Sequence, residues 1–422
     1  MKKVERAVFE ALTDDTSTAG GLTEAAQAVE PGSFLRHAGS LSMTKLADGL
    51  LSPKLVLAWL LTHLGAGSVL VGLLVPIRES LALLPQIVVA PRLQALPRRK
   101  WAWVAGSLVQ GLACAGIAGA GLMLEGAAAG LVICALLAVL AIARSVCSVT
   151  IKDLLGKTVG ASRRGTASGV AASFASVGVI AFALILVVRG DAQFGLVIGA
   201  LCLASVLWVV AAAYFATLTE EARPGKREGA AWSSLMLIRE DRQFRLFIIV
   251  RGLLTATALA PPYLILLGPD EGTFDRLGAL LLASSAASFL SSYVWGRLAD
   301  RSSRQVLMAS GGLGAGALCL ALILAGAGLA GTWWAMPTAL FLLMIAYHGV
   351  RQGRSTYLID MAPEERRAVY GAAASTIIGV ILLGSGLFGA LASLMGTGAT
   401  LGVFAAMSIA AALLAIRLDE VE

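Results

Sequence analysis

Charged side chains stand inside long apolar stretches of this chain, among them Asp48, Lys54, Arg78, Glu79 and Arg251. An ionisable group inside a bilayer costs at least about 2.5–3.5 kcal/mol on insertion scales, so it usually faces a cavity or a partner. The cations could hold an anionic or zwitterionic solute, and a carboxylate could carry a coupling proton. These residues therefore predict a solute-binding site within the apolar region.

Arg78 lies eleven residues beyond Gly67, where its apolar stretch begins. That distance is roughly 16 Å at about 1.5 Å per residue, which places Arg78 near the middle of a bilayer. Glu79 is adjacent and lies about 100° further around a helix, so the two side chains must reach different partners. We expect Arg78, with Lys54 and Arg251, to bind the solute.

Glu79 or Asp48 is the candidate for proton coupling, and neither a catalytic residue nor a metal ligand is predicted. A purely structural role remains the alternative, in which Glu79 pairs with Lys54, and Asp48 pairs with Arg251 or Lys45. Three further cations lie near the predicted ends of their stretches and are interpreted as topology anchors: Arg144, Arg351 and Arg354.

The composition is that of an integral membrane protein. Of the 422 residues, 58% are hydrophobic and 14% are charged, and the mean hydropathy is +0.82. An average soluble domain has about 25% charged residues. A membrane helix needs about 20 mostly apolar residues, and a barrel strand about 9–11. The sequence predicts twelve membrane helices, at about 41–64, 67–90, 101–124, 129–150, 166–188, 194–216, 244–267, 276–296, 305–328, 333–352, 368–391 and 397–416.

Basic residues predict the orientation, because they concentrate in cytoplasmic connections. One set of connections carries basic clusters such as 98–100, 163–164, 239–245 and 366–367, whereas the opposite set holds Arg189 and Arg276. Both termini are therefore predicted to be cytoplasmic. The net charge of +7 then reflects topology, so nucleic acid is not an expected partner. Residues 1–40 lack the apolar core of a signal peptide.

The helices divide into two halves. A polar interval at 217–243 separates six apolar stretches from six, which predicts an N-terminal segment at 1–40, bundles at 41–216 and 244–417, and a tail at 418–422. An internal repeat supports this division. Arg163-Arg164 and Arg366-Arg367 each follow an aspartate and open the next stretch, with Gly169 and Gly371 close behind. Many secondary transporters consist of such repeated halves.

The segment Gly296-Arg-Leu-Ala-Asp300-Arg301-Ser-Ser-Arg304 resembles a loop signature of the major facilitator superfamily, G-x-L-a-D-r-x-G-r. Ser303 replaces its second glycine, and Pro91 and Ala95 replace key residues in the corresponding first-half loop. The resemblance implies an all-α fold of twelve transmembrane helices in two six-helix bundles. It also implies a conformational latch formed by Gly296, Asp300, Arg301 and Arg304.

The resemblance implies a secondary transporter that works by alternating access. With the charged residues above, it predicts an anionic or zwitterionic small solute and proton coupling. The family's proton-antiporter signature is absent from the fifth stretch. Multidrug efflux of lipophilic compounds and a non-transporting membrane scaffold remain alternatives. The abundance of alanine and glycine, and of arginine over lysine, is typical of a GC-rich bacterial genome and places the protein in a bacterial inner membrane.

Two short motifs resemble nucleotide-binding sequences but lack the surrounding residues or elements that such sites need. Gly384-Ser-Gly386-Leu-Phe-Gly389 matches G-x-G-x-x-G but lies inside an apolar stretch with no preceding strand. Gly156-Lys157-Thr158 lacks the upstream glycine of a phosphate loop, because Ile151 stands there. The cysteines fall in apolar stretches without metal spacing. The sequence thus predicts no enzyme, no cofactor and no obligate protein partner beyond the lipid bilayer and the solute.

Overall fold

The computed structural model describes residues 2–13, 27–160, 163–189, 192–222, 237–267, 277–299, 301–363 and 366–421. Regular structure in these ranges is helical throughout. A short helix α1 (Lys2–Thr13) packs on α3, where the Phe9 and Phe34 rings meet edge to face with centroids 5.3 Å apart. Phe9 therefore anchors this short helix on α3.

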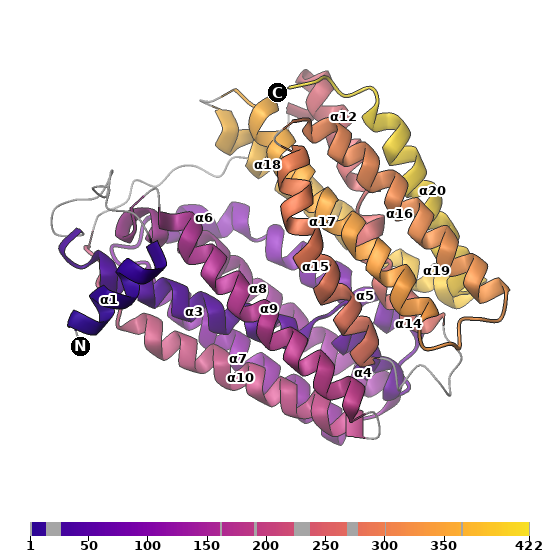
Figure 1. Cartoon of the computed structure of the whole chain (residues 1–422), viewed down its shortest axis with the longest axis horizontal. Coiled ribbons are helices and arrows are strands. Elements are labelled where there is room, and N and C mark those ends of the chain that lie inside the picture. Colours follow the sequence, from indigo (N-terminus) through magenta and orange to yellow (C-terminus); the bar gives the residue numbers. More distant parts are fainter. Residues whose placement is uncertain are drawn as a thin grey trace.

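Two helical bundles make up the rest of the molecule (Figure 1). The first contains α3 (Glu30–Leu51), α4 (Val56–His63), α5 (Ser68–Leu83), α6 (Gln86–Gln94), α7 (Lys100–Met123), α8 (Gly126–Thr158), α9 (Arg164–Val188) and α10 (Gln193–Ala216). The second contains α11 (Leu237–Glu240), α12 (Arg242–Leu253), α13 (Ala256–Leu259), α14 (Pro261–Leu266), α15 (Leu277–Ala299), α16 (Ser303–Gly326), α17 (Ala335–Met361), α18 (Arg367–Gly384), α19 (Leu387–Met395) and α20 (Thr397–Ala415). The all-α membrane fold predicted from composition is confirmed.

Nine helices in the described ranges are long and apolar enough to cross a membrane. The predicted stretches 41–64, 276–296 and 333–352 are not among them. The first is interrupted between α3 and α4, where Pro53 cannot continue a helix. The apolar part of α15 is shorter, Leu277–Ser291, and α17 carries Arg351, Arg354 and Asp360 in its second half.

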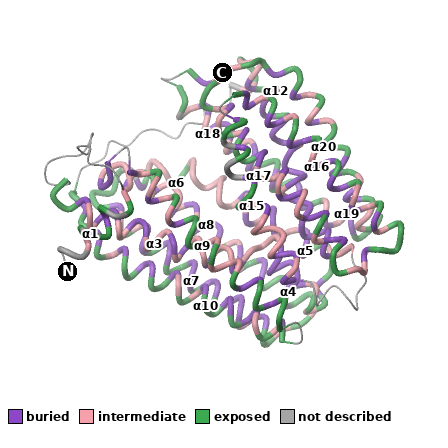
Figure 2. The backbone as a smooth tube through the Cα atoms, in the orientation of Figure 1, coloured by how far each residue is buried: buried purple, intermediate pink, exposed green. Residues whose placement is uncertain are grey.

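Exposed and buried residues follow the expectation for a bilayer. Figure 2 shows exposed residues along the outward faces of both bundles and buried residues between the helices. Many of the exposed side chains are large and apolar, among them Leu112, Val188 and Leu394. A soluble protein rarely exposes such extended apolar surface, whereas lipid tails cover it without cost.

The bundles join at one end and separate toward the other (Figure 1). At the joined end α5 packs against α19, and a Cβ on Gly72 would lie 2.6 Å from the Gly389 Cα. A Cβ on Gly278 of α15 would lie 2.7 Å from the Val187 backbone nitrogen of α9. Such close backbone approach requires glycine. The separated end holds α6 and α18, on the side predicted to be cytoplasmic.

A carboxylate after the last helix of each bundle binds the start of an earlier helix of that bundle. Glu220 accepts hydrogen bonds from the backbone N–H groups of Arg99 (2.9 Å) and Lys100 (2.8 Å), where α7 begins. Glu420 accepts a hydrogen bond from Ser302 and pairs with Arg304 (2.7 Å), where α16 begins. Anions stabilise helix N-termini. The two halves thus share a structural device as well as a sequence repeat.

Candidate functional site

The central feature of the first bundle is a half-buried carboxylate held by two arginines. Asp48 of α3 pairs with Arg78 of α5 through a 2.6 Å contact between Oδ1 and Nη2, and its Oδ2 pairs with Arg144 of α8. Arg78 is buried. The pairing of Asp48 with Arg251 or Lys45 that was considered from sequence is wrong, because Asp48 pairs with Arg78 and Arg144 instead.

Arg144 was expected to be a topology anchor at a helix end. The structure extends α8 to Thr158, so Arg144 lies fourteen residues, or roughly 21 Å, before the end of the helix. Lys45 was a candidate partner of Asp48, but its Nζ donates to the Ser168 carbonyl of α9 at 2.9 Å. The continuation of helical sequence past residue 150 was the signal that could have placed Arg144 deep in the bundle.

Lys54 and Glu79 do not form the ion pair considered from sequence. The Lys54 Nζ lies 3.5 Å from the ring centroid of Tyr347 on α17, a cation–π contact that joins the two bundles. Glu79 is half-buried and lies near Arg78 and Tyr347. Within the described ranges no ion pair of Glu79 is found, so this carboxylate is available for another partner.

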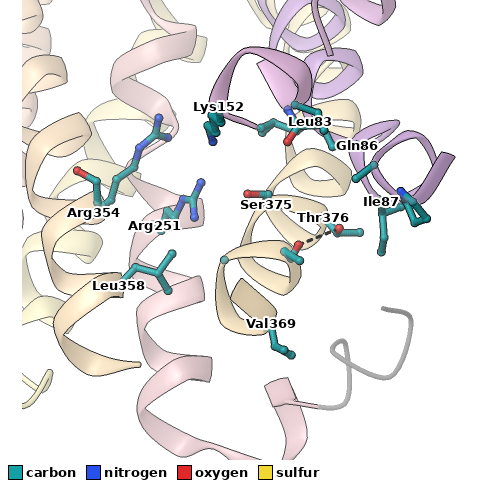
Figure 3. A pocket seen from close by; sticks show the side chains of 16 residues that line it. Leu83, Gln86, Ile87, Lys152, Arg251, Arg354, Leu358, Val369, Ser375 and Thr376 are labelled. Atoms are coloured by element: carbon teal, nitrogen blue, oxygen red, sulfur yellow. Dashed lines mark hydrogen bonds between the residues drawn. The ribbon is translucent and has the colours of Figure 1, made fainter. Parts of the chain in front are cut away.

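Arg251 lies apart from the other predicted residues, in a cavity between the bundles (Figure 3). The cavity encloses about 640 Å³, and its lining includes none of Asp48, Lys54, Arg78 and Glu79. Among the described residues, no hydrogen bond reaches the buried Nε of Arg251. The structure therefore brings Asp48 and Arg78 together and gives Arg251 different neighbours.

Three cations dominate the polar lining of this cavity. Lys152 comes from α8 of the first bundle, whereas Arg251 of α12 and Arg354 of α17 come from the second. Figure 3 shows Ser375 and Thr376 of α18 beside them. No carboxylate belongs to the lining as the structure describes it. Guanidinium, ammonium and hydroxyl donors in this arrangement suit an anionic group, because charge-assisted hydrogen bonds are the strong ones. Lys152 was not expected in a binding site, and Arg354 was expected to be a topology anchor at the end of its helix.

The structure describes three of the four residues of the predicted latch. Gly296 lies in α15, Arg301 is exposed just after that helix, and Arg304 pairs with Glu420 of its own bundle. Asp300 lies outside the described residues. The latch therefore stays a prediction. The first half has an ion-pair cluster in the corresponding region, in which Asp153 pairs with Arg99 and, at 2.9 Å, with Lys157.

Comparison with known proteins agrees with this architecture. A family model described as Major Facilitator Superfamily matches residues 254–422. No curated protein matches the chain. Among solved structures, a mutant of the nucleoside transporter NupG has a TM-score of 0.70 at 12% identity, covering 92% of this chain and 100% of that one.

Two structures of a POT family transporter are also similar, each covering 91% of this chain and 95% of the other at 10% identity. The complex with a thioalcohol-conjugated peptide has a TM-score of 0.69, and the complex with 5-aminolevulinic acid has 0.67. At such identities the likeness concerns the fold. The sequence model of the superfamily covers the second bundle, and the likeness in fold to these transporters covers nearly the whole of this multi-pass membrane protein.

Proposed function

We propose that the protein is a secondary transporter that carries a small anionic solute across the membrane by alternating access. The observation that supports this proposal most directly is the cavity lined by Lys152, Arg251 and Arg354. Its cations come from both bundles, so a bound anion contacts both at once. Alternating access needs this arrangement, because the two halves of such transporters rock around a site that they share.

The net charge of the site favours an anion over a zwitterion. A zwitterion also carries a cationic group, and the described lining offers that group no carboxylate. The same argument weighs against lipophilic cations, the usual cargo of multidrug efflux, since uncompensated like charges in a low-dielectric site repel strongly. We therefore place Arg251, Arg354 and Lys152 in solute binding.

Glu79 is the residue that we assign to proton coupling. Protonating Asp48 would leave the buried Arg78 and the half-buried Arg144 without their counter-charge, which is unfavourable. Glu79 forms no such ion pair within the described ranges, and it lies near Tyr347, at the contact between the bundles. A proton on Glu79 is therefore compatible with the surrounding charges, and its gain or loss occurs where the two halves meet.

A binding screen followed by flux measurements tests the proposal. Purified protein is heated with organic anions, zwitterions and lipophilic cations, because a ligand that binds the folded state raises its stability by RT ln(1 + [L]/Kd). We expect stabilisation by anions, and uptake of the same anions into proteoliposomes. Replacing one charge-assisted contact, as in Arg251→Gln, should weaken binding about tenfold or more.

Arg189→Gln is the matched control, because Arg189 is an exposed cation at the end of α9 outside the cavity. It should bind and transport as the wild type does. Stabilisation by lipophilic cations alone would overturn the anion proposal in favour of multidrug efflux. Ligand binding without flux in either direction would favour the non-transporting scaffold.

A further inference from the structure

A second cavity of about 300 Å³ lies between the two bundles. It is lined by α3 and α9 of the first bundle and by α15 and α17 of the second, and it shares no lining residue with the cavity around Arg251. Its described lining contains basic residues and hydroxyls but no carboxylate: Lys45, His348, Arg351, Ser52, Ser176, Ser284, Ser285 and Ser288.

The positive charge in this second cavity is not balanced by its neighbours. Arg351 lies close enough to Lys45 and Arg144 for the three cations to repel one another. The nearby carboxylate of Asp48 is already shared by two arginines. Lys45 is fixed in place by its 2.9 Å hydrogen bond to the Ser168 carbonyl. An anion in the cavity would relieve this repulsion.

His348 supplies a second and independent indication of a ligand. Its Nε2 is buried and has no hydrogen-bond partner in the described structure. A buried polar atom without a partner is costly, so such an atom lining a cavity indicates a missing ligand. In the tautomer that carries hydrogen on Nε2, His348 is able to donate to an anion beside Arg351.

The helices that border the cavity also present apolar surface. On α9, Phe174 is 57% exposed one residue before the lining residue Ala175, and on α15, Phe289 is 77% exposed one residue after Ser288. The helices α9 and α15 pack against each other at the junction of the bundles (Figure 1). A ligand with a charged head and apolar chains matches both the cations inside and the apolar surface alongside.

We propose that this second cavity binds the phosphate group of an anionic lipid, with Arg351, His348 and Lys45 as its main contacts and the serine hydroxyls as further donors. The acyl chains then lie along the exposed apolar faces of α9 and α15. Free inorganic phosphate carries the same anionic oxygens and is the alternative ligand. This inference does not depend on the proposed transport of an anion through the first cavity.

The test is a thermal-unfolding titration of the delipidated full-length protein in a neutral detergent. The probes are dioleoylphosphatidylglycerol, dioleoylphosphatidylcholine and inorganic phosphate. We expect phosphatidylglycerol to raise the midpoint of unfolding more than phosphatidylcholine, whose headgroup is neutral overall. Arg351→Gln should weaken the phosphatidylglycerol effect about tenfold in apparent Kd, because it removes a charge-assisted contact.

Arg354→Gln is the matched control, since it removes the same charge three residues away on α17 but from the other cavity. It should keep the response to phosphatidylglycerol. His348→Gln provides a second test if Arg351→Gln fails to fold, and native mass spectrometry of the retained lipid gives a readout independent of stability.

Each outcome either identifies the ligand as a lipid or as free phosphate, or shows that the site is wrong. Stabilisation by inorganic phosphate alone, lost in Arg351→Gln and kept in Arg354→Gln, supports the oxyanion site with free phosphate as its ligand and overturns the lipid assignment. If Arg351→Gln and Arg354→Gln weaken the stabilisation by phosphatidylglycerol equally, the lipid does not bind in the second cavity. No response to any of the three probes overturns the proposal entirely.

Discussion

The pairing of Asp48 with two arginines shows how much one carboxylate can determine inside a membrane bundle. It links α3, α5 and α8 through contacts to Arg78 and Arg144. Removing one partner of a fully buried ion pair costs about 3–5 kcal/mol, because an uncompensated charge remains. The side chain of Arg144 is 39% exposed, which lowers the expected cost here.

We therefore predict that Asp48→Asn destabilises the protein by about 2–3 kcal/mol. The substitution keeps the shape of the side chain while removing the charge that both arginines share. Thermal unfolding in detergent checks this, with Glu79→Gln as the control, since Glu79 has no ion pair within the described ranges. Equal stability of the two variants would show that the arginines find other counter-charges.

Glu79→Gln carries a separate prediction about coupling. If Glu79 exchanges the proton, the variant should still equilibrate substrate across a membrane but should not accumulate it against a gradient. The physical reason is that glutamine keeps hydrogen-bonding capacity and cannot ionise. Counterflow and pH-driven uptake in proteoliposomes measure the two activities separately. Unchanged accumulation would exclude Glu79 as the coupling residue.

These residues also mark the limit of prediction from sequence at this scale. Charged residues in apolar stretches are visible in the sequence, and five were identified. Their partners depend on how each helix is rotated about its axis and where it ends in space. Arg144 was therefore misjudged, because the true end of α8 lies beyond the predicted stretch. Tyr347 gave no signal, since an aromatic residue in an apolar helix has many possible neighbours.

At the scale of the elements, helix starts are held by carboxylates from distant segments. Glu220 follows α10, yet it accepts both backbone N–H bonds at the start of α7. Lys100 adds bonds from its Nζ to the carbonyls of Ala216 (2.9 Å) and Leu218 (2.8 Å) at the end of α10. This reciprocal arrangement joins the end of one helix to the beginning of another, as Glu420 does for α16.

We predict that Glu220→Gln destabilises the first bundle by about 1–2 kcal/mol. The neutral amide keeps one oxygen acceptor but loses the second, and hydrogen bonds to charged acceptors contribute about 1.5–3 kcal/mol. Hydrogen–deuterium exchange of the first turn of α7 should accelerate. Glu10→Gln is the control, because the Glu10–Arg6 pair on α1 is exposed and such pairs contribute little. Unaltered exchange in Glu220→Gln would contradict the prediction.

At the scale of the whole molecule, length and hydropathy sufficed to predict helices crossing a membrane in two halves. A membrane helix satisfies its own backbone, so its existence is a local property. The angle between the bundles is not local, because it depends on contacts such as Gly72 with Gly389. The sequence accordingly predicted one site with five residues, whereas the structure divides those residues between the Asp48 cluster, the Lys54–Tyr347 contact and the cavity around Arg251.

The distribution of cations across the two bundles leads to a final prediction about the conformational equilibrium. Closing the separated end would bring Lys152 of the first bundle toward Arg251 and Arg354 of the second, which line the same cavity. Without a bound anion this closure is opposed by repulsion, which increases in a medium of low dielectric constant and weakens with salt. Neutralising one cation on each side, as in Lys152→Gln with Arg354→Gln, should therefore favour the closed state.

Spin labels report this change as a distance. Leu96 follows α6 and Arg367 begins α18, so a label at each spans the separated end in a background without the exposed Cys202 and Cys319. The double variant should populate shorter distances than the parent without any ligand. Raising the salt concentration should shift the parent in the same direction and shift the double variant less, because two of the charges that salt screens are absent from it. If the label distances of the parent do not change with salt, packing at the joined end, rather than charge, keeps the bundles apart.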